Sequence, residues 1–221
     1  MAQDLLYFLV KRDIQVIYKQ TVLGFAWAFI QPLFMMVIFS IVFGVMAKMP
    51  SDGIPYPLFS YAALVPWIYF SQALTGSTNS LVAAAGLLSK VYFPRIIIPM
   101  VPVLAKLVDF LISFLILFAL MAYYGFFPNI NIIFLPYLII LMILTSSGIG
   151  MWLSALAIQY RDIKFAINFL VQALMYAAPV VWPASLLLEK FGQAEYLLYG
   201  LYPMAGVIER FRAALLGQTE M

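Results

Sequence analysis

The feature that most constrains this chain is a run of residues, 21–47, that contains no charged side chain. A helix crosses the hydrocarbon core of a bilayer with about 20 consecutive apolar residues, so this run is long enough to span a membrane. Further apolar runs cover residues 56–79, 96–124, 132–158 and 165–182. Backbone inside lipid must satisfy its own hydrogen bonds, which favours helices. The sequence therefore predicts an all-α integral membrane protein with five transmembrane helices, in a single domain over residues 1–221.

The composition agrees with a lipid environment and narrows the possible chemistry. Hydrophobic residues make up 66% of the chain and charged residues 10%, whereas a typical soluble domain has about 25% charged residues. The absence of Cys and His excludes thiol catalysis, histidine acid–base catalysis and Cys/His metal sites. The acidic residues are scattered, and no catalytic motif is recognisable. We therefore expect a transport subunit rather than an enzyme, with no catalytic residue, no metal and, at a net charge of +3, no nucleic-acid partner.

The first 20 residues predict an amphipathic helix that lies in the membrane interface. Apolar side chains such as Leu6 and Leu9 fall on one helical face, and basic ones fall on the opposite face. The residues assigned to lipid headgroups are Lys11, Arg12 and Lys19. Lys and Arg are enriched on the cytoplasmic side of membrane proteins. A cytoplasmic N-terminus puts seven of them inside (Lys11, Arg12, Lys19, Lys90, Arg95, Arg161, Lys164) and four outside (Lys48, Lys190, Arg210, Arg212), so we predict that orientation.

The segment between the second and third apolar runs combines a short predicted helix, 81–89, with a basic and aromatic loop. Its apolar side chains could fill a groove in a soluble partner, and its basic ones could meet acidic residues or lipid phosphates. The residues concerned are Leu87, Leu88, Lys90, Tyr92, Phe93, Pro94 and Arg95. A basic loop is also what the positive-inside rule produces without any partner, so the residues alone leave both interpretations open.

Two charged residues, Lys106 and Asp109, lie inside the third apolar run, three positions apart on one helical face. The favoured interpretation is a neutralising ion pair near the cytoplasmic end of the span, where the Lys106 ammonium group can extend toward water. The alternative is a proton relay in an ion-coupled carrier. Such a carrier usually has repeated halves and more acidic residues in its spans.

The last segment, 184–221, is predicted to form short extracellular helices that fold back on the bundle. Pro203 is suited to the start of a helix over residues 204–216, and Gly217 is suited to its end. About 13 residues rise roughly 20 Å, which is too short to cross a bilayer. On this helix, Glu209 and Arg212 are expected to lie off the apolar face.

Several motifs, taken in chain order, resemble those of the ABC-2 type permeases, and most closely the polysaccharide and polyol-phosphate exporters for O-antigen, capsule and teichoic acid. The first apolar run has four of them, the loop that follows the second run and the turn between the fourth and fifth have one each, and two lie at the end of the fifth run and in the last segment. The motifs are Val22-Leu23-Gly24, Trp27-Ala28, Gln31-Pro32-Leu33, Phe43-Gly44, Lys90-Val91-Tyr92-Phe93-Pro94-Arg95, Tyr160-Arg161-Asp162-Ile163, Pro179-Val180 and Tyr202-Pro203-Met204.

This resemblance implies a bacterial inner-membrane permease that forms a homodimer around a central channel. Two copies of a separate ATPase subunit would bind ATP and Mg, so this chain itself would need no cofactor. The substrate would be a lipid-linked glycan, and the amphipathic helix and the 81–95 loop would transmit the ATP-driven movement. The family also has a sixth span after the extracellular helices. We therefore expect five spans in this sequence, one fewer than the six of the family.

The resemblance also directs attention to aromatic side chains, because sugar rings present apolar C–H faces to aromatic rings. The candidate channel aromatics are Trp27, Phe34, Tyr69, Phe70 and Tyr176. Packing against lipid or other helices is an equally good explanation for each. Arg161 and Asp162 belong to the cytoplasmic turn. Two other functions stay open, namely an ABC-2 permease for a drug or simple lipid, and an ion-coupled carrier.

Overall fold

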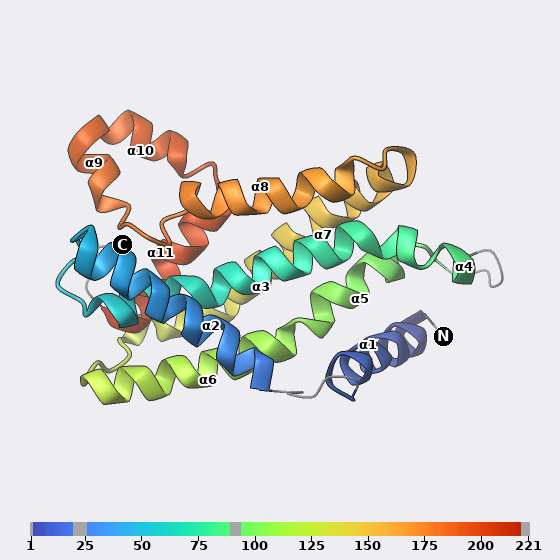
Figure 1. The fold of residues 1–221 in the computed structure, drawn as a ribbon, viewed down its shortest axis with the longest axis horizontal. Coiled ribbons are helices and arrows are strands. Elements are labelled where there is room, and N and C mark those ends of the chain that lie inside the picture. The colour runs from blue at the N-terminus through green and yellow to red at the C-terminus, as the bar shows by residue number, and fades with distance from the viewer. Residues whose placement is uncertain (1, 20–25, 89–93, 218–221) are drawn as a thin grey trace.

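The structure is a computed structural model that describes residues 2–19, 26–88 and 94–217, and within these residues all regular structure is helical (Figure 1). The helices that precede residue 125 are α1 (Ala2–Lys19), α2 (Ala26–Phe39) with its π-helical extension η1 (Ser40–Met46), α3 (Tyr56–Ala83), α4 (Ala85–Leu88), α5 (Ile97–Ala105) and α6 (Leu107–Tyr124). Those that follow are the 3₁₀ turn η2 (Ile130–Phe134), α7 (Leu135–Gln159), α8 (Ile163–Ala177), α9 (Ser185–Phe191), α10 (Gln193–Tyr199) and α11 (Pro203–Leu216).

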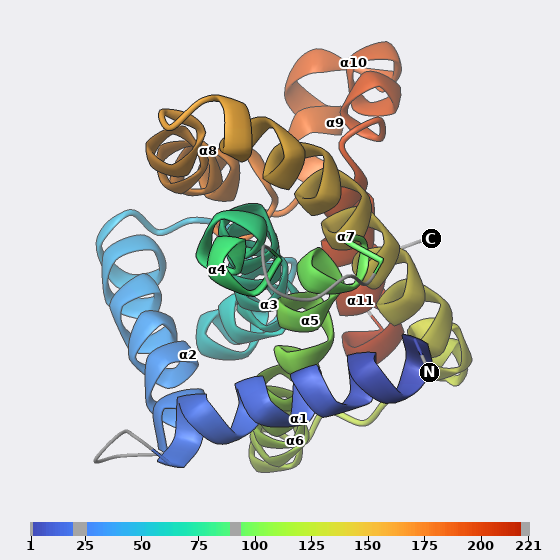
Figure 2. The same ribbon diagram turned by 90° about the vertical axis from the view of Figure 1, so that its right-hand side faces the viewer.

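The long helices run along one axis of the molecule, so the bundle has two distinct ends (Figure 1). The α1 end contains α1, α4 and the turn at 160–162, and α1 lies crosswise to the bundle there (Figure 2). The α11 end contains the segment 47–55, the turn at 125–129 and the helices α9, α10 and α11. This separation matches the sides that the sequence assigns to the same segments.

Helix α3 forms the centre of the bundle, where it contacts α2, α5, α6, α7, α8 and α11. Most of its apolar side chains are buried, as expected for a helix that is apolar on all sides. The polar side chains of its second half are buried or half-buried, and Thr78 donates a hydrogen bond of 2.8 Å to the Leu74 carbonyl. Helix α7 approaches α3 closely at Gly150, where a Cβ atom would lie 2.5 Å from the Ser77 hydroxyl oxygen.

Three helical segments are long and apolar enough to cross a membrane: Ala26–Met46, Ile97–Tyr124 and Ile130–Gln159. Helix α3 has sufficient length, at 28 residues, but its second half is less apolar. Helix α8 is apolar but has only 15 residues, which rise roughly 22 Å. Helices therefore occupy all five predicted spans. By length and composition, three of these five are suited to cross a membrane.

The boundaries differ from the prediction at three places. The second helix continues to Ala83 and takes up the start of the predicted 81–89 helix, leaving α4 as a single turn. The third is divided at Lys106 into α5 and α6. The fifth ends at Ala177 instead of residue 182. Ala178 is extended because the residue that precedes Pro179 disfavours the α conformation.

Candidate functional site

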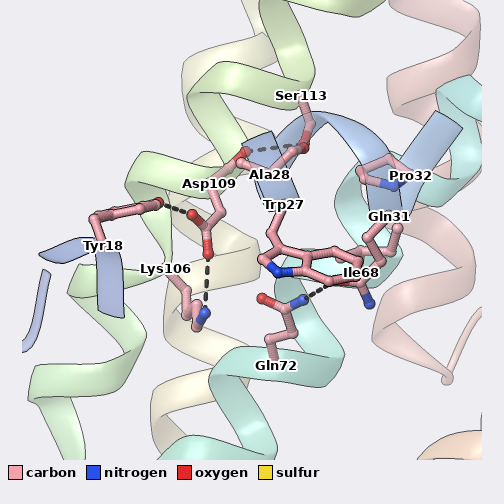
Figure 3. Close-up of a pocket in the computed structure, with 10 residues that line it drawn as sticks. All are labelled: Tyr18, Trp27, Ala28, Gln31, Pro32, Ile68, Gln72, Lys106, Asp109 and Ser113. Carbon is pink, nitrogen blue, oxygen red and sulfur yellow. Dashed lines mark hydrogen bonds and ion pairs between the residues drawn. The ribbon is translucent and has the colours of Figure 1, made fainter. Parts of the chain in front are cut away.

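A small polar cavity of about 110 Å³ lies toward the α1 end, between α1, α2, α3 and the break that separates α5 from α6 (Figure 3). It combines one cation, one carboxylate, a phenol, an indole and two carboxamides in an otherwise apolar bundle. The lining residues are Tyr18, Trp27, Ala28, Gln31, Pro32, Ile68, Gln72, Lys106, Asp109 and Ser113.

Lys106 owes its position to the helix break. Pro102 lies one turn before this break and has no N–H group, so the regular helix bond to the Ile98 carbonyl is lost. The Lys106 amide donates to the Pro102 carbonyl at 3.0 Å, and Lys106 both ends α5 and precedes α6. Asp109 consequently lies in the first turn of α6, where the positive end of the helix dipole favours a carboxylate.

The ion pair between Lys106 and Asp109 is present, with 2.9 Å between Nζ and Oδ2. The side chains are 23% and 19% exposed, so the pair is mostly but not fully buried. The second carboxylate oxygen, Oδ1, accepts a hydrogen bond from the Tyr18 hydroxyl of α1. The Asp109 carboxylate thus connects α1 to α6, although Tyr18 and Asp109 are 91 residues apart in the sequence.

Helix α1 also makes apolar contacts, which involve α5 and lie further toward the N-terminus than this hydrogen bond. Leu9 is buried against Ile97 and Val101 of α5. Burial raises the pKa of Asp13, and the charges of Arg12 and Lys106 partly offset that effect. Helix α1 therefore contacts α5 through Leu9 and α6 through Tyr18, about two and a half turns further along the helix.

Two further hydrogen bonds connect the other walls of the cavity. Gln72 of α3 donates to Gln31 of α2 at 3.1 Å. The Ser113 hydroxyl of α6 lies 2.9 Å from the Asp109 carbonyl and 3.3 Å from the Ala28 carbonyl of α2. Four elements are therefore tied together by polar side chains at one place (Figure 3).

This arrangement is suited to mechanical connection rather than to bond chemistry. Both carboxylate oxygens of Asp109 already accept hydrogen bonds or an ion pair, which leaves neither free as a general base in this conformation. Among the residues that the structure describes, no group of three His, Cys, Asp or Glu could hold a metal ion. The geometry favours the neutralising pair over the proton relay.

Other residues proposed from the sequence lie around the α1 end. Lys11 and Arg12 are exposed on α1, as are Arg161 and Asp162 in the turn before α8. In the 81–95 segment, Leu88 is half-buried, and Pro94 and Arg95 are exposed. Outside the described residues lie Lys90, Tyr92 and Phe93, together with the side chains of Lys19 and Leu87.

The candidate channel aromatics divide into two groups. Trp27, Phe34 and Tyr176 are exposed on α2 and α8. Tyr69 and Phe70 are each only 2% exposed. The Tyr69 hydroxyl donates to the Val103 carbonyl at 3.1 Å, and the Phe70 ring packs against a neighbouring indole. These two side chains pack the interior of the chain, so they are not available to line a channel between copies.

The sequence did not predict that the hydrogen-bonding partners of this cavity meet, although Gln31 belongs to one of the family-like motifs. Tyr18, Gln31 and Gln72 each come from a different helix, and a sequence pattern within one helix contains no information on such a meeting. Arg212 was expected off the apolar face of α11, but its side chain is fully buried. The one available signal was its position as a lone cation in an apolar stretch, Phe211 to Leu216.

Comparison with known proteins gives one family. Residues 4–216 match the sequence model of the family described as ABC-2 type transporter. The chain is 28% identical over 212 residues to the O-antigen export system permease protein RfbA of Myxococcus xanthus, covering 96% of this chain and 80% of that protein. It is 28% identical over 189 residues to a protein of the same name from Klebsiella pneumoniae, covering 85% and 72%. The polysialic acid transport protein KpsM of Escherichia coli is 24% identical over 210 residues, covering 93% and 78%.

Proposed function

The chain belongs to the ABC-2 type transporter family, and from that premise we propose that it is the membrane subunit of an ATP-driven exporter for a lipid-linked polysaccharide. The single observation that carries this proposal is the family match over residues 4–216, which includes both the crosswise α1 and the helices of the α11 end. Relatives named for O-antigen export and polysialic acid transport support the class of substrate. In this role the chain moves its substrate and hydrolyses nothing itself.

The proposed complex contains two copies of this chain and two ATPase subunits that bind ATP and Mg. The α1 end faces the cytoplasm of a bacterium, and the segments α2–η1, α3, α5–α6, α7 and α8 cross its inner membrane. Exposed cations at that end, among them Lys11, Arg12, Arg95 and Arg161, support this orientation because they suit lipid phosphates and an acidic partner surface. The exposed aromatics Trp27, Phe34 and Tyr176 are the candidates to contact sugars.

The cavity supplies the connection that such a machine requires. A force applied to α1 by an ATPase subunit reaches α6 through Tyr18 and Asp109, and it reaches α5 through the packing of Leu9. The Gln31–Gln72 hydrogen bond extends the same connection to α2 and α3. The break at the α5–α6 junction is therefore the point where movement of α1 would first alter the bundle.

The proposal is tested by expressing the chain with its ATPase subunit in cells that synthesise a lipid-linked polysaccharide but lack its permease. We expect the two subunits to co-purify and polysaccharide to reach the cell surface. Phe93→Ala combined with Arg95→Ala should keep insertion and abolish export while ATP hydrolysis continues. A membrane-inserted chain that binds no ATPase would refute the proposal, and export of a small lipid or drug without polysaccharide would change the substrate class.

A further inference from the structure

An irregular segment, 178–184, connects α8 to α9 at the α11 end, and side chains from other helices satisfy its backbone. Buried backbone groups outside regular structure need such partners. The Tyr56 hydroxyl of α3 donates to the Val181 carbonyl at 2.7 Å, and the Tyr199 hydroxyl of α10 donates to the Ala177 carbonyl at 2.7 Å. Helices α3 and α10 therefore both hold the backbone around the end of α8.

Arg212 of α11 makes the central contact with this segment. Its side chain is 1% exposed, and its Nη2 atom donates to the Pro179 carbonyl at 2.5 Å. The guanidinium carbon lies 3.7 Å from the centroid of the Phe59 ring on α3, which is within cation–π distance. A single side chain thus contacts the segment that follows α8 and the start of α3.

Glu209 completes the arrangement one turn earlier on α11. Its Oε1 atom lies 3.3 Å from Nη1 of Arg212 and accepts a hydrogen bond of 3.0 Å from the Ala184 amide. The Arg212–Glu209 pair therefore holds the segment at both of its ends, at Pro179 and at Ala184. Burial lowers the pKa of Arg212, and the carboxylates of Glu209 and Asp52 raise it again.

These contacts define a unit that is difficult to open in small steps. A buried guanidinium separated from its carboxylate and carbonyl partners would be an uncompensated charge in an apolar environment, which is strongly disfavoured. Asp52, from the loop before α3, accepts a hydrogen bond of 3.2 Å from the Ser185 hydroxyl at the start of α9. The first turn of α9 is thereby joined to the loop that precedes α3.

We propose that Arg212 is a positioning residue of the exporter that locks the outer end of α8, the segment 178–184 and α11 against α3, so that they move as one body during transport. This inference rests on the proposed function. In it, Arg212 touches no substrate and acts through the position of α8. The lock keeps the outer end closed until the whole unit is displaced by the movement that starts at the α1 end.

The natural absence of cysteine makes the lock directly measurable. Val180→Cys places one thiol inside the segment, where Val180 is 0% exposed, and Leu201→Cys places a control thiol at a site that is 77% exposed. Maleimide labelling would be followed in the purified complex with the ATPase subunit, in each case with Arg212, Arg212→Met or Arg212→Lys. The Lys variant keeps the charge but lacks the planar guanidinium, whose separate nitrogens donate to Pro179 and Glu209 at the same time.

With Arg212 present, Val180→Cys should label slowly, and it should stay protected during ATP turnover because the unit moves as one body. With Arg212→Met we expect labelling at least about tenfold faster, export reduced at least about tenfold and ATP hydrolysis retained. Arg212→Lys should restore part of both protection and export. Leu201→Cys should label equally in all three.

Two outcomes would overturn the lock: continued protection of Val180→Cys in Arg212→Met, or exposure of Val180→Cys by ATP turnover while Arg212 is intact. If Arg212→Met does not insert into the membrane, Glu209→Gln is used instead. This variant keeps an acceptor for the Ala184 amide and removes the charge opposite Arg212. Unchanged labelling of Val180→Cys in Glu209→Gln would contradict the lock. Labelling in the absence of ATP requires no substrate. Failure of the parent complex to export polysaccharide would therefore refute the proposed function while leaving the labelling result valid.

Discussion

The close approach of α7 to α3 at Gly150 gives a sharp test of the packing. A Cβ atom at position 150 would lie 2.5 Å from Oγ and 2.6 Å from Cβ of Ser77. The hydroxyl oxygen could rotate away, but the Ser77 Cβ atom is fixed to the backbone of α3. That contact is about 0.8 Å shorter than the 3.4 Å at which ordinary contact begins, so Gly150→Ala must separate the two helices.

The expected cost follows from the size of this separation. Overpacking of a close-packed interior costs about 1–3 kcal/mol, while replacing a helical Gly by Ala returns up to about 1 kcal/mol. We therefore expect Gly150→Ala to destabilise the protein by roughly 1–2 kcal/mol. Gly148→Ala is the matched control, since a Cβ atom there meets nothing within 4 Å, and it should be neutral or slightly stabilising.

The measurement is the midpoint of thermal unfolding of the detergent-purified chain, compared at one heating rate because unfolding of membrane proteins is rarely reversible. Ser77→Gly combined with Gly150→Ala exchanges the small and the larger side chain across the interface and should recover most of the loss. Equal midpoints for Gly150→Ala, Gly148→Ala and the parent chain would refute the close approach of α3 and α7.

Two further predictions concern packing and charge. Gly44→Ala should lower the unfolding midpoint, because a Cβ atom at position 44 would lie 2.9 Å from the Tyr56 ring. Displacement of that ring would weaken the hydrogen bond from the Tyr56 hydroxyl to the Val181 carbonyl. Gly206→Ala is the control, since a Cβ atom there meets nothing within 4 Å. Lys106→Met should destabilise the chain by about 1–3 kcal/mol, the typical cost of a lost hydrogen bond to a charged group, whereas Lys106→Met combined with Asp109→Leu should cost less because no unpaired charge remains. A double variant less stable than Lys106→Met would contradict this account of the pair.

A third prediction isolates the connection from α1. Tyr18→Phe removes the only hydroxyl that α1 gives to Asp109 in the described part of the chain, and it should reduce export at an unchanged rate of ATP hydrolysis. Tyr7→Phe, at an exposed position of the same helix, should leave both unchanged. Equal export by the two variants would show that α1 transmits force by its apolar contacts alone.

Much of the helix order was predictable from the sequence because it follows from local rules. Each apolar run became a helix, Gly125 adopts the left-handed conformation at the end of α6, and α11 begins at Pro203 and ends before Gly217 as predicted. The end of α8 at Ala177 also follows from a local rule, the effect of Pro179 on its predecessor. Applying that rule would have given the correct boundary.

The remaining features depend on contacts between distant segments. Arg212 is buried because Pro179, Glu209 and Phe59 surround its guanidinium group, and two of these partners come from other parts of the chain. The burial of Tyr69 has the same origin, since its hydroxyl finds a carbonyl on α5. A helical wheel identifies neighbours within one helix only, so it could not distinguish such a side chain from one that faces a channel.

The two polar sites differ in a way that gives each a distinct mechanical role. At the α1 end, the charges are partly exposed, so water can replace the contact between Tyr18 and Asp109 when α1 moves. At the α11 end, Arg212 is sealed from water, so its contacts are preserved unless the whole unit moves. Helix α3 contacts both sites, the first through Gln72 and the second through Phe59. We therefore expect that movement which begins at the α1 end displaces α3. At the α11 end, α11 and the end of α8 should move together with α3.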